Sequence, residues 1–102
     1  MDLNQIFNRI ERGKQQGKTY SFEQDGETIW SSVAIQKWEG RYKVYIDEIR
    51  ASKMDAEEYQ KELTVSFDTL KEAAAFIAAE TRIEFHELSP CKGQTIFNPQ
   101  FD

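Results

Sequence analysis

Periodic apolar residues near the N-terminus predict an amphipathic helix. The apolar side chains recur every three or four residues, the spacing of one helix face, and they are Leu3, Ile6, Phe7 and Ile10. We predict this helix over residues 2–12. Asp2 is a candidate cap, and Gly13 or Gly17 is the candidate end.

Alternating apolar and polar residues then predict three strands in sequence. The strands cover residues 18–24, 28–38 and 41–50. The dipeptide Asp25-Gly26 between the first two is typical of a type I′ hairpin turn, because both of its central residues need a positive φ. Glu39-Gly40 predicts a second tight turn. The three strands are therefore expected to be antiparallel neighbours.

The second half of the chain predicts a loop, a strand and a helix. Residues 51–61 break the alternation and predict an exposed acidic loop that can hold one helical turn. A strand is predicted over residues 62–67. Alanine-rich residues 68–81 predict a helix that Asp68 or Thr69 can cap, and Thr69 and Glu72 have the spacing of a capping box.

A last strand and a packed tail are expected after this helix. We predict the strand over residues 82–88, with Ile83 and Phe85 facing inward and Pro90 ending it. Residues 91–102 form the tail, whose apolar side chains are expected to pack on the body. They are Ile96, Phe97 and Phe101.

This order of elements predicts an α+β fold. We expect an antiparallel sheet of about five strands, with an N-terminal helix and a second helix before the last strand. A chain of 102 residues fits one domain, residues 1–102, that is large enough to bury a core.

The strand over residues 28–38 has two apolar faces, and the pattern does not say which one is buried. Trp30 and Trp38 share one face, and Ile29, Val33 and Ile35 share the other. If the aliphatic face is the core, both tryptophans lie outside, where aromatic residues are typical of protein interfaces. If the helices cover the tryptophans, they belong to the core instead.

The charge of the chain narrows the classes of partner. The formal net charge is -5, so nucleic acid and anionic membrane surfaces are not expected as partners, and a basic protein is favoured. Residues 1–5 lack the basic and apolar regions of a signal peptide, and no apolar run is long enough to span a membrane. We therefore expect a cytoplasmic protein.

No motif predicts catalysis, a cofactor or a metal site. His86 and Cys91 are the only residues of their kinds, and they lie five positions apart. Alternation with Ile83 and Phe85 predicts that His86 faces solvent, and a lone cysteine is more often a small buried hydrophobe than a reactive thiol. The single cysteine excludes an internal disulfide and a cysteine-based zinc site. The five glycines form no phosphate-binding loop. We expect a protein that is not an enzyme and carries no cofactor.

Acidic residues are concentrated between residues 47 and 62, a segment that contains six acidic and three basic residues. We interpret their side chains as a solvated surface. Clustering and expected exposure make some of them, with two aromatic residues, candidates for partner binding. These candidates are Asp47, Glu48, Asp55, Glu57, Glu58, Tyr59 and Trp38.

Three segments together resemble immunity proteins of bacterial contact-dependent growth inhibition systems. They are Val44-Tyr45-Ile46-Asp47-Glu48, the segment Phe67–Ala73 and the tail segment Ser89–Pro99. The tail segment contains the sequence Lys-Gly-Gln-Thr-Ile-Phe-Asn-Pro at residues 92–99. The resemblance implies a cognate toxin C-terminal domain as partner, often a basic nuclease such as a tRNase. It also implies neutralisation of that domain by steric and electrostatic occlusion.

Two other classes of function stay open. One is an acidic adaptor or inhibitor domain of another bacterial or phage system. The other is a small enzyme or ligand-binding fold, which needs a pocket with converging polar groups. The sequence is compatible with a monomer and with a homodimer.

Overall fold

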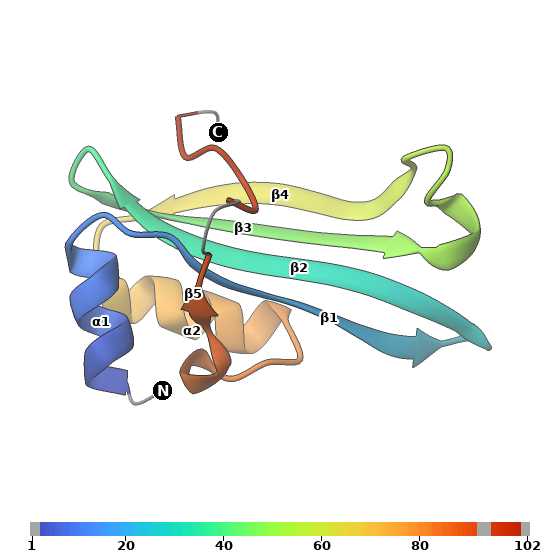
Figure 1. Cartoon of the computed structure of the whole chain (residues 1–102), viewed down its shortest axis with the longest axis horizontal. Coiled ribbons are helices and arrows are strands. Elements are labelled where there is room, and N and C mark those ends of the chain that lie inside the picture. Colours follow the sequence, from blue (N-terminus) through green and yellow to red (C-terminus); the bar gives the residue numbers. More distant parts are fainter. Residues whose placement is uncertain (1–2, 92–94, 101–102) are drawn as a thin grey trace.

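The computed structural model describes residues 3–91 and 95–100, and it confirms the α+β fold. An antiparallel sheet of five strands has the order β4-β3-β2-β1-β5. The elements follow along the chain as α1 (Leu3–Glu11), β1 (Gln16–Gln24), β2 (Glu27–Trp38), β3 (Arg41–Arg50), the 3-10 helix η1 (Ala51–Lys53), β4 (Tyr59–Phe67), α2 (Leu70–Glu80), the 3-10 helix η2 (Phe85–Glu87) and β5 (Ser89–Pro90). Both α-helices lie on one side of the sheet and the C-terminal tail lies on the other (Figure 1).

Both predicted hairpin turns are confirmed. Asp25 and Gly26 have φ of 52° and 77°, and Glu39 and Gly40 have φ of 51° and 80°. These paired positive angles match a type I′ turn, whose twist suits the flanking strands. The Glu39-Gly40 turn sets the register in which Ile29 to Trp38 of β2 pairs with Arg41 to Arg50 of β3.

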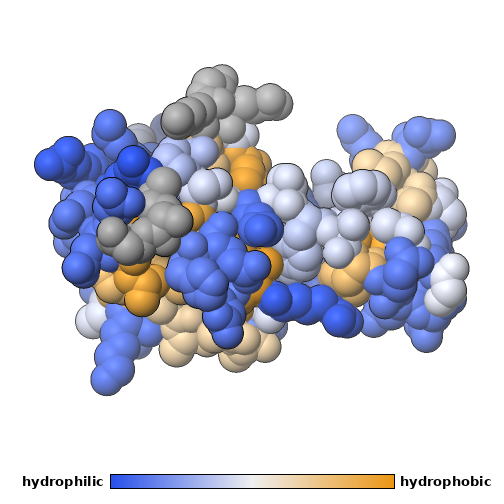
Figure 2. All heavy atoms as spheres, turned by 60° about the horizontal axis from the view of Figure 1, so that its bottom comes forward, coloured by the Kyte–Doolittle hydropathy of each residue, from blue (hydrophilic) through white to orange (hydrophobic). Residues whose placement is uncertain are grey.

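The hydrophobic core lies between the helices and the inner face of the sheet. Ile6 and Ile10 of α1 and Ala73 and Ile77 of α2 are buried there. They meet the aliphatic face of the central strands, whose buried members are Val33, Ile35, Val44 and Ile46. From this side, hydrophobic atoms are visible among the hydrophilic residues of the surface (Figure 2). The aliphatic face of β2 is therefore the core face.

The predicted helix cap is confirmed, with the helix shorter than expected. The Glu72 backbone N–H donates to Thr69 Oγ1 at 3.1 Å, and Thr69 is the N-cap of α2. This bond satisfies one of the donors that the first helical turn leaves unpaired. None of the helices in the part of the chain that the structure describes is long and apolar enough to cross a membrane.

The prediction of a strand over residues 82–88 is wrong. The chain forms η2 there, and the last strand is the two-residue β5, which pairs with Gln16 and Gly17 of β1. The Glu84 N–H donates to Glu87 Oε2 at 2.6 Å, and the Glu87 N–H donates to the Glu84 carbonyl at 2.9 Å. Backbone groups that a strand would offer to the sheet are thus used locally. The inward packing of Ile83 and Phe85 is confirmed, since Ile83 is buried and Phe85 is half-buried against the core.

Strand β4 begins earlier than predicted, at Tyr59 rather than Glu62. A register shift at Glu48 and Ile49 of β3 accommodates the extra length. This irregularity brings Tyr59 opposite Ile49 at the start of the strand. The acidic loop therefore ends at Glu58, with η1 as its one helical turn.

The tail packs across the outer face of the sheet, as expected for its apolar residues. Phe97 is buried and Ile96 is half-buried. The expected cap Asp2 and the expected packing of Phe101 lie outside the described residues.

Candidate functional site

The outer face of the sheet is hollowed between the tail and the loop that joins β3 to β4. Two adjoining hollows of about 250 and 370 Å³ both have Thr19, Ser32 and Asp47 in their walls. One extends to Trp30 and Tyr59, and the other ends at the tail residue Ile96. We name this continuous depression the Asp47 groove.

Large apolar side chains gather at the loop end of the groove. Trp30 and Met54 are 45% exposed, and Tyr59 is 44% exposed. Among the described residues, Leu3 is the only other large hydrophobic side chain that is exposed. Ile49 lies opposite both Trp30 and Tyr59 in the sheet, so the three side chains are neighbours on one face. We name Trp30, Ile49, Met54 and Tyr59 the outer-face patch. Clustered exposed apolar residues of this kind mark interaction surfaces more often than scattered ones do.

The floor of the groove holds a carboxylate that is nearly buried. Asp47 is 9% exposed. Its Oδ1 accepts the Ser32 backbone N–H at 2.9 Å, and its Oδ2 lies 3.0 Å from the Tyr45 hydroxyl. The same hydroxyl lies 2.8 Å from Glu62 Oε2. A phenol has one proton to donate, so Asp47 and Glu62 share a single donor.

The groove carries negative charge that no cation in the described chain balances. The ion pairs among the described residues involve neither Asp47 nor Glu62. Burial raises the pKa of Asp47, and the charge of Glu62 adds to this effect. Burial also raises the pKa of Tyr59, helped by the charges of Asp47, Glu62 and Glu57. The patch and the acids are thus close enough to share one electrostatic environment.

The tail builds one wall of the groove and positions the hydroxyl at its floor. Gln15 Oε1 accepts the backbone N–H of Ile96 at 2.7 Å, and Gln15 Nε2 donates to the Phe97 carbonyl at 2.9 Å. The Phe97 ring stacks on the Tyr45 ring, with centroids 5.5 Å apart and planes 9° apart. Gln15 therefore holds the segment that packs against Tyr45.

A close approach of the tail requires a glycine beneath it. A Cβ on Gly17 would lie 2.6 Å from Ile96 Cδ1 and 2.7 Å from the Val33 carbonyl oxygen. Both distances are shorter than any real contact of a Cβ. The residue is needed for space here, not for an unusual backbone angle.

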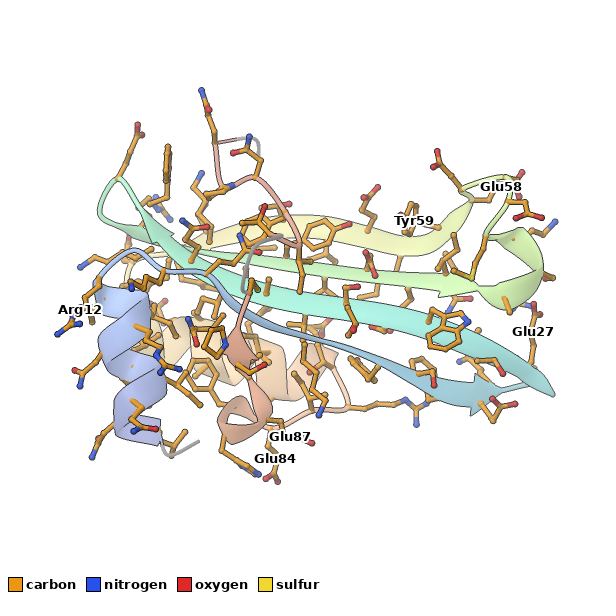
Figure 3. All side chains as sticks on the ribbon, in the orientation of Figure 1. Arg12, Glu27, Glu58, Tyr59, Glu84 and Glu87 are labelled. Atoms are coloured by element: carbon orange, nitrogen blue, oxygen red, sulfur yellow. The ribbon has the colours of Figure 1, made fainter. Side chains whose placement is uncertain are left out.

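The structure brings some of the candidate partner-binding residues together and separates others. Asp55, Glu57 and Glu58 are exposed in the loop beside Tyr59, and Figure 3 shows Glu58 and Tyr59 at the same end of the sheet. Trp38 is half-buried at the far end of β2, eight residues or about 26 Å of strand from Trp30.

The two adjacent acids of β3 lie on opposite faces. Glu48 faces the helical side and accepts a hydrogen bond from Gln60 Nε2 at 3.0 Å. Asp47 faces the groove, and its expected solvation is wrong, since it is 9% exposed and its carboxylate is hydrogen-bonded by Ser32 and Tyr45. The residues that sequence reasoning missed are Thr19, Ser32, Tyr45, Ile49, Met54 and Glu62. The hairpin register, which places Ser32 opposite Asp47 and Trp30 opposite Ile49, is the signal that could have found most of them.

No hydrogen bond among the described residues joins His86 to Cys91. His86 Nδ1 lies 3.2 Å from Glu84 Oε2, on the exposed surface. Burial raises the pKa of the Cys91 thiol, which is opposite to the shift that activates a nucleophile. Within residues 3–91 and 95–100, no group of three or more His, Cys, Asp or Glu side chains could hold a metal ion.

Comparison with known proteins gives no relative from which to transfer a function. No protein-family model matches the chain, and neither a curated protein nor a solved structure matches it.

Proposed function

We propose that this protein binds a basic protein through the outer-face patch and the Asp47 groove, and inhibits it by covering its surface. The observation that carries the proposal is the gathering of three exposed large apolar side chains beside a groove whose acids take part in no ion pair of the described residues. Trp and Tyr are the residue types that most often dominate the free energy of protein association. Acids around them favour a basic partner and speed its approach.

The class of inhibitor that fits these features best is an immunity protein. A nuclease toxin has a substrate site built for phosphate, so it offers a basic surface to an acidic inhibitor. The inhibitor would act one-to-one in the cytoplasm, by steric and electrostatic occlusion and without turnover. The segment that includes Asp47 also belongs to the resemblance on which this class rests.

The test begins with capture of the partner from native lysate by the tagged protein, followed by its identification. We expect a basic protein bound in one-to-one ratio and released as salt is raised, because salt screens attraction between exposed charges. Trp30→Ala and Tyr59→Ala should each weaken this binding at least about tenfold, the usual loss for an interface anchor. Leu3→Ala is the matched control, since Leu3 is as exposed but lies on α1.

The protective function is then tested by measuring the growth of cells that express the captured toxin domain. Co-expression with the captured toxin domain should restore growth with the wild-type protein and not with the Trp30→Ala variant. Capture of a basic protein that is not toxic, with the same dependence on Trp30, would favour the adaptor or inhibitor alternative. Capture that is unchanged by both patch substitutions would contradict the proposed surface.

A further inference from the structure

Among the described residues, no ion pair reaches either of the two acids at the Asp47 groove. Asp47 and Glu62 lie opposite each other in the sheet and compete for the one proton of the Tyr45 hydroxyl. A carboxylate that is 9% exposed is poorly hydrated, so it is stabilised most by a partner that arrives with its own charge. A cation placed between these acids would satisfy both.

The apolar walls of the groove indicate what must carry the positive charge. The hollow that contains Asp47 is also lined by the apolar side chains of Trp30, Met54, Tyr59 and Ile49. An apolar wall over an acidic floor suits a side chain with an apolar stem and a charged tip. The hollow of about 250 Å³ is open to solvent on the patch side, so such a side chain can enter from a docked protein.

The geometry points to this groove as a subsite for an arginine side chain of the partner, whose guanidinium bridges Asp47 and Glu62 beside the Trp30 ring. That the arginine belongs to a protein partner rests on the proposed function. A guanidinium presents several N–H donors in a planar fork, so it can bond two separate carboxylates and still lie against an aromatic face. An ammonium is a compact, strongly hydrated charge and gains less from the aromatic wall.

The inference can be tested without the partner. N-acetyl-arginine amide is titrated into the ¹⁵N-labelled protein, and the indole N–H of Trp30 and the backbone N–H of Ser32 are followed by NMR. We expect saturable shifts at both signals, because Trp30 lines the groove and the Ser32 N–H donates to Asp47. N-acetyl-citrulline amide, which has nearly the same shape and no charge, should produce none.

Variants locate the binding at the two acids. Asp47→Asn and Glu62→Gln should each weaken binding of the arginine probe about tenfold or more, as expected for the loss of a charged hydrogen-bond partner. Asp68→Asn is the matched control, since it makes the same change of charge at an exposed residue beyond the opposite end of β4. It should leave binding unchanged.

Three results would overturn the arginine subsite. They are no saturable shift, equal binding of the citrulline probe, and equal or tighter binding of N-acetyl-lysine amide. Failure of the arginine probe, with partner capture still dependent on Trp30, removes the subsite and leaves the proposed function standing. Binding of the probe without capture of any basic protein removes the proposed function and leaves the subsite.

Discussion

At the residue scale, Asp47 is a carboxylate whose burial opposes its ionisation. A nearly buried carboxylate without a cation is unfavourable for the folded state, although Ser32 and Tyr45 donate hydrogen bonds to it. Binding sites often contain such groups, because the interaction that they lack in isolation is supplied by the ligand.

We expect Asp47→Asn to stabilise the protein at pH 7. Asparagine keeps the acceptor for the Ser32 N–H and removes the buried charge, so the free energy of unfolding should rise by about 0.5–1 kcal/mol. Urea unfolding measures the change, and Asp68→Asn controls for the change in net charge. A variant less stable than wild type would show that the charge is already compensated.

The pH dependence of this difference has a definite sign. The pKa of Asp47 is raised above its ordinary value of 3.8, so the folded state binds its proton more tightly than the unfolded state does. This contribution favours folding at low pH and is lost as pH rises through the raised pKa. The stability gain of Asp47→Asn should therefore be small near pH 3 and largest at neutral pH. Unfolding at a series of pH values tests this, and a gain largest at acid pH would contradict it.

Gly17→Ala should destabilise the protein by about 1–3 kcal/mol, the usual range for forcing an atom into packed space. The added methyl group meets Ile96 Cδ1 and the Val33 carbonyl oxygen. A second substitution, Ile96→Ala, should relieve only part of this loss, because the contact with the Val33 backbone remains. Thermal unfolding of the single and double variants measures both effects. Full recovery in the double variant would mean that the strand backbone yields easily.

At the element scale, the tail is a structural part of the site. It is held by Gln15, whose side chain bonds the backbone of Ile96 and Phe97 from 81 and 82 residues away. Phe97 in turn stacks on Tyr45, whose hydroxyl contacts Asp47 and Glu62. The shape and charge of the groove thus depend on a segment far away in the chain.

We expect Gln15→Ala to release the tail while β1, β2 and β3 stay folded. Hydrogen exchange at the amides of Ile96 and Phe97 should become faster by at least tenfold, because both donate to the lost Oε1. Gln36→Ala is the control, since Gln36 bonds Gln15 Nε2 and donates to the Gly13 carbonyl, and no hydrogen bond joins it to the described residues of the tail. Equal exchange rates in both variants would mean that Phe97 packing alone holds the tail.

At the scale of the whole molecule, the sheet separates a structural side from a side open to a partner. The helices cover the inner face, and the tail covers only part of the outer face (Figure 1). Exposed acids lie on both sides, so net charge alone does not orient a partner. The outer-face patch distinguishes the two sides, because it lies on the outer face alone.

Charge reversal at two matched positions tests that orientation. Glu58→Lys, beside the outer-face patch, should slow association with the basic partner about two- to tenfold at low salt. Glu84→Lys, at the N-cap of η2 on the helical side, should change the rate little, although the change in net charge is the same (Figure 3). Stopped-flow mixing at two salt concentrations measures both rates. Equal slowing by both variants would mean that only net charge guides the encounter.

The sequence alone determined the elements whose causes are local. Asp25-Gly26 and Glu39-Gly40 specify their turns through the φ angles that they adopt, and Thr69 with Glu72 starts α2 through bonds within one turn. Such signals depend on a few neighbouring residues, so they can be recognised before the fold is known.

Only the tertiary structure decided where the site lies. Both faces of β2 carry apolar residues, so periodicity could not tell which one the helices cover or that Trp30 is exposed. Asp47 shares a hollow with the tail residue Ile96, and the outer-face patch joins residues from three strands and the loop after η1. Packing between distant segments produces these features, and a pattern read along the chain does not contain that information.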